Sequence, residues 1–488
     1  MTRRDRSTGP DEPPAPEDTC SAAPGLSLVR GGSARLGVVA AGVALCTVAG
    51  TVLSATVAQR TVVNQGGSGW DLVRLLALWV PVWAAGAVLI RSLPGRWALV
   101  ACVVGAVAIR GAALAGPPGL SDDLYRYAWD AKVQLSGVDP YERAPLDPTL
   151  APLRERWLFP DLTASDATRI NRPTVHTIYP PLAQAWFVAV RVVTGGAAGE
   201  RPWQAAAAVV DLGLCALLAV GLRRLGADPR LAAWWCLSPV AAVELVNNAH
   251  VDGVAVALSV AAVLVARRRP GLAGGLVGAA AMVKLYPALL LVAVARRRPL
   301  VAGGAFAAVC TLAYLPHVLA VGVKVLGYLP GYLKEERYDR GGRFLLLSAS
   351  RLPTDALPLL AGVVLLAVVL VVWWADLPAV RAAPVLLGAL LLVTTPVQPW
   401  YAASVAALGL LDRAWWWAVL AVVAWPYYVG VLLDDPNADV VGRWSYGAAL
   451  VVLVTAAVLR RRAVGRGSVE PSPSAGRNVR PQALASDP

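Results

Sequence analysis

The chain has 488 residues, of which 57% are hydrophobic and only 15% are charged, and its mean hydropathy is +0.57. Soluble domains usually carry about 25% charged residues, so this composition excludes an ordinary soluble protein. The net charge of +13 comes largely from arginine clusters at the ends of apolar segments, and it requires no nucleic-acid partner. We therefore predict an all-α protein that crosses the membrane many times.

The N-terminal part begins with a polar, proline-rich tail, residues 1–35, which we predict to be disordered and cytoplasmic. Three segments of membrane-spanning length follow, at 36–57, 72–90 and 97–115. Because arginines in the tail place the N-terminus inside, the long loop 116–180 is expected on the outer side.

The middle of the chain is less regular. Segment 181–194 has only 14 residues, so we expect it to be tilted or partly inserted. "RRRP" at 267–270 and again at 296–299 should both face the cytoplasm, although one straight helix between them would leave one cluster outside. Two short half-helices that meet near Lys284 satisfy both ends. The other candidate spans here are 203–222, 231–249 and 251–266.

The C-terminal part continues the apolar pattern and ends in "RRR" at 460–462, which predicts a cytoplasmic C-terminus. Its candidate segments are 301–319, 355–374, 383–396, 401–411, 414–433 and 444–459. The prediction is therefore one transmembrane domain, 36–462, with 13–15 membrane segments, followed by a disordered cytoplasmic tail, 463–488.

The chemically distinctive residues all fall in loops predicted on the outer side, whereas the inner loops are mostly short connectors of Arg, Pro and Gly. The outer set comprises 116–180, "NNAHVDG" at 247–253, "VKLYP" at 283–287, "EERYDRGGR" at 335–343 and "PVQPWY" at 396–401. Segments far apart in sequence would meet on one face, which is the arrangement that an extracytoplasmic active site needs.

In the first of these loops, "SDDLYRYAWDAKVQLSG" predicts an amphipathic helix that starts after Ser121, ends at Gly137 and can lie at the membrane interface. Asp123, Tyr127, Asp130 and Gln134 share its polar face. Asp122 and Asp123 have two interpretations: they cap the helix, or one of them is a general base for a sugar hydroxyl.

Ionisable residues inside apolar segments are costly and commonly functional. His250 and Asp252 lie in an apolar hairpin, where the alternative is simple contact with water, and Lys284 lies mid-segment, where snorkelling explains it poorly. An anion such as a lipid phosphate would satisfy Lys284, but so would Asp252 or Glu244. We expect Glu244 and Asp211 to be structural hydrogen-bond partners. His176 fits either a site or a surface position.

Aromatic residues in the outer loops suit a sugar ligand, because a pyranose stacks one apolar face on a ring. The alternative is the aromatic belt of membrane interfaces, and Tyr125, Tyr127 and Tyr141 fit either interpretation. The sequence has no phosphate-binding glycine loop, dinucleotide fingerprint or His–Cys metal spacing. It therefore gives no support for a cytosolic nucleotide donor, a cofactor or a metal site, and any activated substrate should arrive through the membrane.

Six short patterns between about 120 and 410 resemble the GT-C superfamily of polyprenol-phosphate-sugar glycosyltransferases, and most closely glycosyltransferase family 87 and the actinobacterial α-mannosyltransferases. The patterns are D-x-Y-x-Y at Asp123, Tyr125 and Tyr127, G-x-x-P-Y at Gly137, Pro140 and Tyr141, Y-P-P-L at 179–182, N-x-H-x-D-G at Asn248, His250, Asp252 and Gly253, K-x-Y-P at Lys284, Tyr286 and Pro287, and Q-P-W-Y at 398–401.

The resemblance implies a GT-C-like fold with a large first extracytoplasmic loop in the plasma membrane of an actinobacterium. It implies transfer of a sugar, most simply mannose, from a polyprenyl phosphate to a lipid-anchored glycan, with inversion and with an Asp as base. Asp123 is the preferred base by its spacing to the tyrosines, and Asp122 is the alternative. The predicted phosphate-binding residues are Lys284, His250, Asp252 and Arg126, and the predicted substrate-binding residues are Tyr125, Tyr127, Tyr141, His176, Tyr179, Gln398, Trp400 and Tyr401.

Two other functions remain open from the sequence. Broken helices and charges in mid-membrane are also found in transporters and lipid flippases. A catalytically inactive scaffold for cell-envelope assembly would share the same composition. The 65-residue outer loop and the lack of an internal repeat favour the transferase.

Overall fold

We describe the fold in a computed structural model, which covers residues 69–93, 95–160, 167–339 and 342–467. The predicted span 36–57 and tail 1–35 lie outside these residues, as does most of the C-terminal tail. The described residues form helices and connecting loops without a β-strand, which confirms the all-α prediction.

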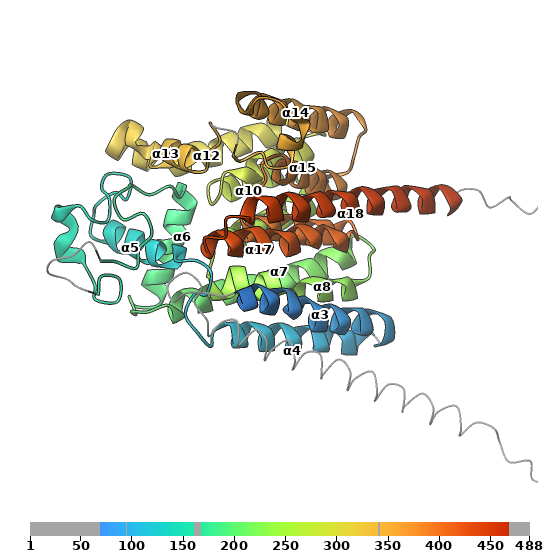
Figure 1. Cartoon of the computed structure of the whole chain (residues 1–488), viewed down its shortest axis with the longest axis horizontal. Helices are drawn as coiled ribbons and strands as arrows, with labels where there is room; N and C mark the ends of the chain where they lie inside the picture. The colour runs from blue at the N-terminus through green and yellow to red at the C-terminus, as the bar shows by residue number, and fades with distance from the viewer. Residues whose placement is uncertain (1–68, 94, 161–166, 340–341, 468–488) are drawn as a thin grey trace, which may run out of the picture.

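Seven stretches among the described residues are long and apolar enough to cross a membrane, and they form most of the bundle in Figure 1. Their principal helices are α3 (Gly69–Ser92), α4 (Gly95–Ala113), α7 (Arg201–Arg224), α12 (Pro299–Val321), α14 (Leu357–Trp374), α17 (Val419–Leu432) and α18 (Ala438–Gly467). The last helix runs five residues beyond the predicted domain end at 462. These helices confirm a polytopic membrane protein.

Shorter apolar helices complete the bundle. The π-helical segment η3 (Ala241–Asn247) and α9 (Asp252–Val265) form a pair bent by 118°. Near Lys284, α10 (Pro270–Ala281) ends and the short helices η4 (Tyr286–Leu290) and α11 (Leu291–Val294) begin, so the predicted pair of half-helices is present. The others are α6 (Pro181–Val193), α8 (Ala233–Cys236), α15 (Ala379–Val393) and α16 (Pro399–Leu411).

Helices α5 (Asp123–Leu135) and α6 lie together at one end of the bundle (Figure 1). The α5 helix lies within two residues of the predicted bounds at each end, and Gly137 follows it with a left-handed φ of 86°. Its polar face is covered, however: Tyr127 and Asp130 are 1% and 2% exposed. The helix is therefore packed inside the protein, and it does not present the free polar face expected of an interfacial amphipathic helix.

A buried ion pair ties three helices of the bundle together. Arg110 in α4 donates to Asp211 in α7 at 2.6 Å and to the carbonyl of Cys236 at the end of α8. The indole of Trp235 donates to the other oxygen of Asp211 at 3.0 Å. Two buried charges are tolerable in an apolar interior only when they are paired and hydrogen-bonded in this way. Asp211 thus has the structural role expected from the sequence.

The remaining helical turns connect these elements. They are η1 (Pro148–Leu153), η2 (Pro229–Ala232), η5 (Gly322–Leu326), α13 (Leu329–Glu335), η6 (Leu347–Ser350), η7 (Thr354–Ala356) and η8 (Trp415–Ala418). The α13 helix follows α12 and η5 directly and lies at the same end of the bundle as α5 and α6 (Figure 1).

Candidate active site

Two asparagine side chains fix the start of the loop that carries Asp122 and Asp123. The carbonyl oxygens of Asn247 and Asn248 both accept from the backbone N–H of Gly119 at 3.0 Å, and that of Asn248 also accepts from Leu120 at 3.0 Å. The amide of Asn247 donates in turn to the carbonyl of Pro117 at 3.1 Å. This loop segment has no regular partner strand or helix, so the hairpin side chains satisfy its backbone groups.

Further contacts hold the same two segments together. Gln204 in α7 donates to the carbonyls of Gly116 at 3.0 Å and Asn247 at 2.8 Å, and the Tyr428 hydroxyl donates to the carbonyl of Leu120 at 2.6 Å. Ala249, at the tip of the hairpin, has a φ of 52°, a left-handed conformation that costs a non-glycine residue about 1–2 kcal/mol. The surrounding contacts hold this conformation, which places His250 next to Asp123.

The Asp123 carboxylate has polar neighbours from four different parts of the chain. One oxygen accepts from the Asn171 amide at 2.5 Å, and the other lies 3.5 Å from the Tyr127 hydroxyl and 3.8 Å from His250 Nε2. Burial opposes ionisation of Asp123, but its interactions with His250 and with the positive charges of Lys284 and Arg172 bring the pKa of its carboxyl below the ordinary value. Asp123 is therefore ionised at neutral pH and can accept a proton.

Helix capping alone does not account for the aspartate pair. Asp122 occupies the N-cap position of α5, but its side chain makes no capping hydrogen bond, and the N–H of Asp123 is bonded by the Ser121 hydroxyl at 3.2 Å. Burial, followed by the negative charge of Asp123, raises the pKa of Asp122 to about 6. The two neighbouring carboxyls thus differ in charge in mildly acidic conditions.

His250 and Lys284 lie beside this pair, each with a fixed partner. The Nδ1 atom of His250 lies 2.8 Å from the carbonyl of Glu244, and its ring stacks on Trp400 at 3.9 Å between centroids. The ammonium of Lys284 lies 3.3 Å from Asp252. Lys284 therefore does form the ion pair that the sequence left open as an alternative, and part of its side chain also borders a cavity.

Lys284 lines a cavity of about 880 Å³ at the end of the bundle. The Lys284 ammonium lies over the rings of Tyr179 and Tyr401 at 5.1 and 5.3 Å from their centroids. The predicted site residues that line the cavity are Asp122, Asp123, Arg126, His176, Tyr179, Lys284, Gln398, Trp400 and Tyr401. Most of the predicted set therefore converges on one space of ligand size.

Other predicted residues lie behind this lining. The Tyr127 ring stacks on Phe187 at 4.3 Å, and the Tyr125 hydroxyl donates to Glu200 at 3.0 Å. The Tyr141 hydroxyl donates to the carbonyl of Tyr179 at 2.6 Å. These contacts give Tyr125 and Tyr141 supporting positions, and their direct contact with substrate stays a prediction.

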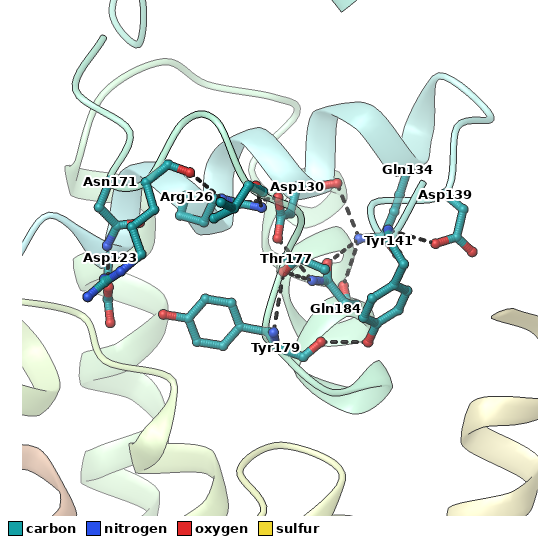
Figure 2. Close-up of polar contacts among 12 residues, drawn as sticks. Asp123, Arg126, Asp130, Gln134, Asp139, Tyr141, Asn171, Thr177, Tyr179 and Gln184 are labelled. Carbon is teal, nitrogen blue, oxygen red and sulfur yellow. Dashed lines mark hydrogen bonds and ion pairs between the residues drawn. The ribbon is translucent and has the colours of Figure 1, made fainter. Parts of the chain in front are cut away.

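Behind the cavity lining, a buried polar network joins Arg126, Asp130 and Gln184 (Figure 2). Arg126 donates to Asp130 at 2.9 Å and to the carbonyls of Arg172 and Val175 at 3.3 and 3.1 Å. Gln184 in α6 donates to the second oxygen of Asp130 at 3.0 Å. These bonds engage every nitrogen of Arg126 and account for its burial, so its predicted contact with phosphate has no support from this arrangement.

Sequence reasoning missed several residues that face Asp123 or the cavity. Asn171 and Arg172 lie in an irregular loop with no periodic pattern, and only the outer position of that loop pointed to them. The sequence places Arg343 in the outer loop 335–343 and gives it no role. In the structure it is 5% exposed, pairs with Glu336 at 2.5 Å and lines the cavity. The Nε of Arg343 has no hydrogen-bond partner among the described residues. Its guanidinium is therefore a second cation that can bind an anionic ligand.

Metal binding has no candidate within the described parts of the chain, where no group of three or more His, Cys, Asp and Glu side chains gathers in reach of one ion. The family model described as Alpha-(1->6)-mannopyranosyltransferase, N-terminal domain, matches residues 18–298, which is more than half of the chain. No curated protein and no solved structure matches.

The chain thus belongs to the alpha-(1->6)-mannopyranosyltransferase family and is a membrane-embedded mannosyltransferase of the GT-C type. The matched residues include Asp123, His250, Asp252 and Lys284. The family confirms the predicted glycosyltransferase, and it favours a transferase over the transporter and the scaffold.

The raised pKa of Asp122 predicts a pH dependence. As pH falls through about 6, protonation of Asp122 removes the negative charge beside Asp123 and makes Asp123 a weaker base. The kcat/KM for mannosyl transfer should therefore decline severalfold below pH 6. The Asp122→Asn variant, already neutral at this position, should show a flat profile at the lower level. Identical acid limbs in wild type and variant would contradict the prediction.

Proposed function

We propose that the protein transfers mannose from a polyprenyl phosphate to a lipid-anchored glycan on the extracytoplasmic face of the plasma membrane. The observation that carries the proposal is Asp123, an ionised carboxylate in a membrane-end cavity with lysine and arginine side chains on the facing walls. A base and a cation in one cavity are what transfer from a phosphate leaving group requires.

The reaction follows from this placement. Asp123 takes the proton from an acceptor hydroxyl, and the oxygen forms a bond to the anomeric carbon of mannose. The bond from that carbon to the phosphate oxygen breaks, and its electron pair stays on polyprenyl phosphate. Because attack and departure occur on opposite faces, a β-linked donor gives an α-linked product.

Two cations are available to the departing phosphate. Lys284 lies near Asp123, and Arg343 lines the same cavity with its Nε free among the described contacts. Leu329 and Leu333 of α13, with Leu390 and Leu391 of α15, supply apolar lining for the first part of a lipid chain. We propose that the phosphate binds between the cations and that its lipid leaves over these leucines.

The charge distribution along the bundle supports the proposed sidedness. The α3–α4 connection, with Arg91 and Arg96, and the C-terminal end of α18, with Arg460–Arg462, lie at the end of the bundle opposite α5 and α6 (Figure 1). Arginine-rich connections favour the cytoplasmic side, so the cavity should open on the other side.

The base is tested by Asp123→Asn, which keeps the size of the side chain and removes its basicity. Turnover should fall by roughly 10²–10⁴, the usual contribution of a general base. Asp122→Asn is the matched control, with the smaller loss described above. The measurement is transfer of labelled mannose by purified protein in nanodiscs. Near-normal turnover of Asp123→Asn would place the base elsewhere.

The donor site is tested by Lys284→Met, which should weaken binding of polyprenyl-phosphate-mannose by roughly 10–100-fold, because a charged hydrogen bond is lost. Lys284→Arg should retain part of the binding. The substitution also leaves Asp252 buried without its cation, so the Lys284→Met/Asp252→Asn double variant controls for misfolding. If the folded double variant binds donor as tightly as wild type, Lys284 serves only the ion pair.

The sidedness is tested with cysteines at two exposed positions, Ala151 and Gly95. A side chain at Gly95 meets no atom within 4 Å, so Gly95→Cys should fold normally. In intact cells, an impermeant thiol reagent should label Ala151→Cys and spare Gly95→Cys, with the unsubstituted protein as the background. The reverse pattern would place the cavity on the cytoplasmic side.

A further inference from the structure

The loop that contains Asn171 is held against α5, the helix that begins at Asp123. Its backbone accepts two hydrogen bonds from Arg126, and Asn171 itself donates to Asp123 at 2.5 Å (Figure 2). This bond engages one oxygen of the Asp123 carboxylate. The other oxygen is left on the side of His250 and Tyr127, and a carboxylate bonded in this way is restricted in its rotation.

The next residue joins this loop to the opposite wall of the cavity. Arg172 has a left-handed φ of 45°, and its guanidinium pairs with Glu335 at the end of α13 through Nε at 2.9 Å and through a second nitrogen at 2.5 Å. The two-point geometry gives this pair directional strength that a single contact lacks. The Tyr328 hydroxyl donates to the same carboxylate at 3.2 Å.

The backbone adds a second link between the same two segments. The N–H of Tyr328 donates to the carbonyl of Thr177 at 3.1 Å, and a side chain in place of the hydrogen of Gly327 would overlap that carbonyl. The α13 helix contributes Leu329, Tyr332 and Leu333 to the cavity lining. A single chain of contacts, Glu335–Arg172–Asn171–Asp123, therefore runs from this wall to the carboxylate.

We propose that Asn171 is a positioning residue for Asp123, and that the Arg172–Glu335 ion pair makes this positioning depend on α13 lying against the loop. The inference rests on the proposed role of Asp123 as base. It assigns Glu335 an effect on turnover although Glu335 does not contact Asp123. Substrate that fits beneath α13 would be met by a correctly oriented Asp123, whereas displacement of α13 would free the Asp123 carboxylate to rotate.

The test uses Asn171→Ala, Glu335→Ala and their double variant in the full chain, in nanodiscs. Each single variant should lower kcat on the order of 10-fold, with a smaller change in KM, because misplacement of a reacting group mainly affects turnover. Since both residues act through one chain of contacts, the double variant should be no slower than the slower single variant. Additive losses would overturn the proposal.

A pH profile separates positioning from general damage to the fold. The charged and titratable groups that face Asp123 are Asp122, Tyr127, Arg172, Tyr179, His250, Asp252, Lys284 and Tyr428. The Asn171 amide donates to Asp123, which favours the ionised carboxylate, and it also lowers the pKa of Asp122, so its loss should move the acid limb to higher pH. An unmoved limb would overturn the proposal. If Asn171→Ala does not fold, Asn171→Leu carries the same test, because it keeps the branched shape and removes the donor without adding a charge.

Two controls complete the design. Arg143→Ala breaks a pair with Asp147, 3.4 Å apart, in the same loop at similar exposure, and should leave turnover unchanged. Asp123→Asn is measured in parallel. If Asp123→Asn is active, the proposed base is wrong. If it is inactive while Asn171→Ala and Glu335→Ala have normal turnover, the base stands and the positioning role is wrong.

Discussion

The active-site geometry depends on the hydrogen bonds that Asn247 and Asn248 make with the backbone of residues 117–120. The chain leaves the membrane helix α4 here and needs partners for its N–H and carbonyl groups in a poorly hydrated place. The bent pair η3–α9 provides them from its tip, and the same tip carries His250 and Asp252. One set of hydrogen bonds therefore satisfies an irregular backbone and brings the aspartate pair to the histidine and, through Asp252, to Lys284. Loss of either amide would leave buried polar groups unpaired and would also displace the loop that carries Asp122 and Asp123.

The electrostatics of the cavity follow a consistent pattern. Lys284 pairs with Asp252, Arg172 with Glu335 and Arg343 with Glu336, so each of these cations has its own carboxylate. An unpaired ammonium or guanidinium would be costly at the buried positions of Lys284 and Arg343, so these two carboxylates stabilise the cavity wall. Asp123 differs, because its neighbours include several cations but it forms no close ion pair with any of them, and its shortest bond is to the neutral amide of Asn171. Its second oxygen faces Tyr127 and His250 at 3.5 and 3.8 Å, while the local charge keeps the carboxylate ionised.

Much of this arrangement could be predicted from the sequence, and the reasons differ from residue to residue. The half-helices at Lys284 follow from two arginine clusters that should share one side of the membrane but are too close for two full spans between them, and the α5 helix follows from its periodicity and from Gly137. His250 and Lys284 stand out because charges in apolar surroundings are rare, and Asp123 stands out by its place at the start of a helix and its spacing to the tyrosines. Asn171, Arg172 and Arg343 could not be assigned this way, since polar residues in irregular loops are unremarkable until the fold brings them together. Periodicity also placed Tyr127 and Asp130 on a polar face but could not show that Phe187 and Gln184 would cover them.

The matched family domain and the cavity do not have the same boundaries. Residues 18–298 contain Asp123, the proposed base, and its neighbours Asn171, His250 and Lys284. The opposite wall comes from later residues, among them Tyr332, Glu335, Arg343, Trp400 and Tyr428. The two parts are joined by particular contacts: the His250–Trp400 stack, the bond from Tyr428 to Leu120, and the Arg172–Glu335 pair. The matched segment therefore forms only part of the cavity wall, and the proposed positioning of Asp123 involves a helix that lies beyond that segment.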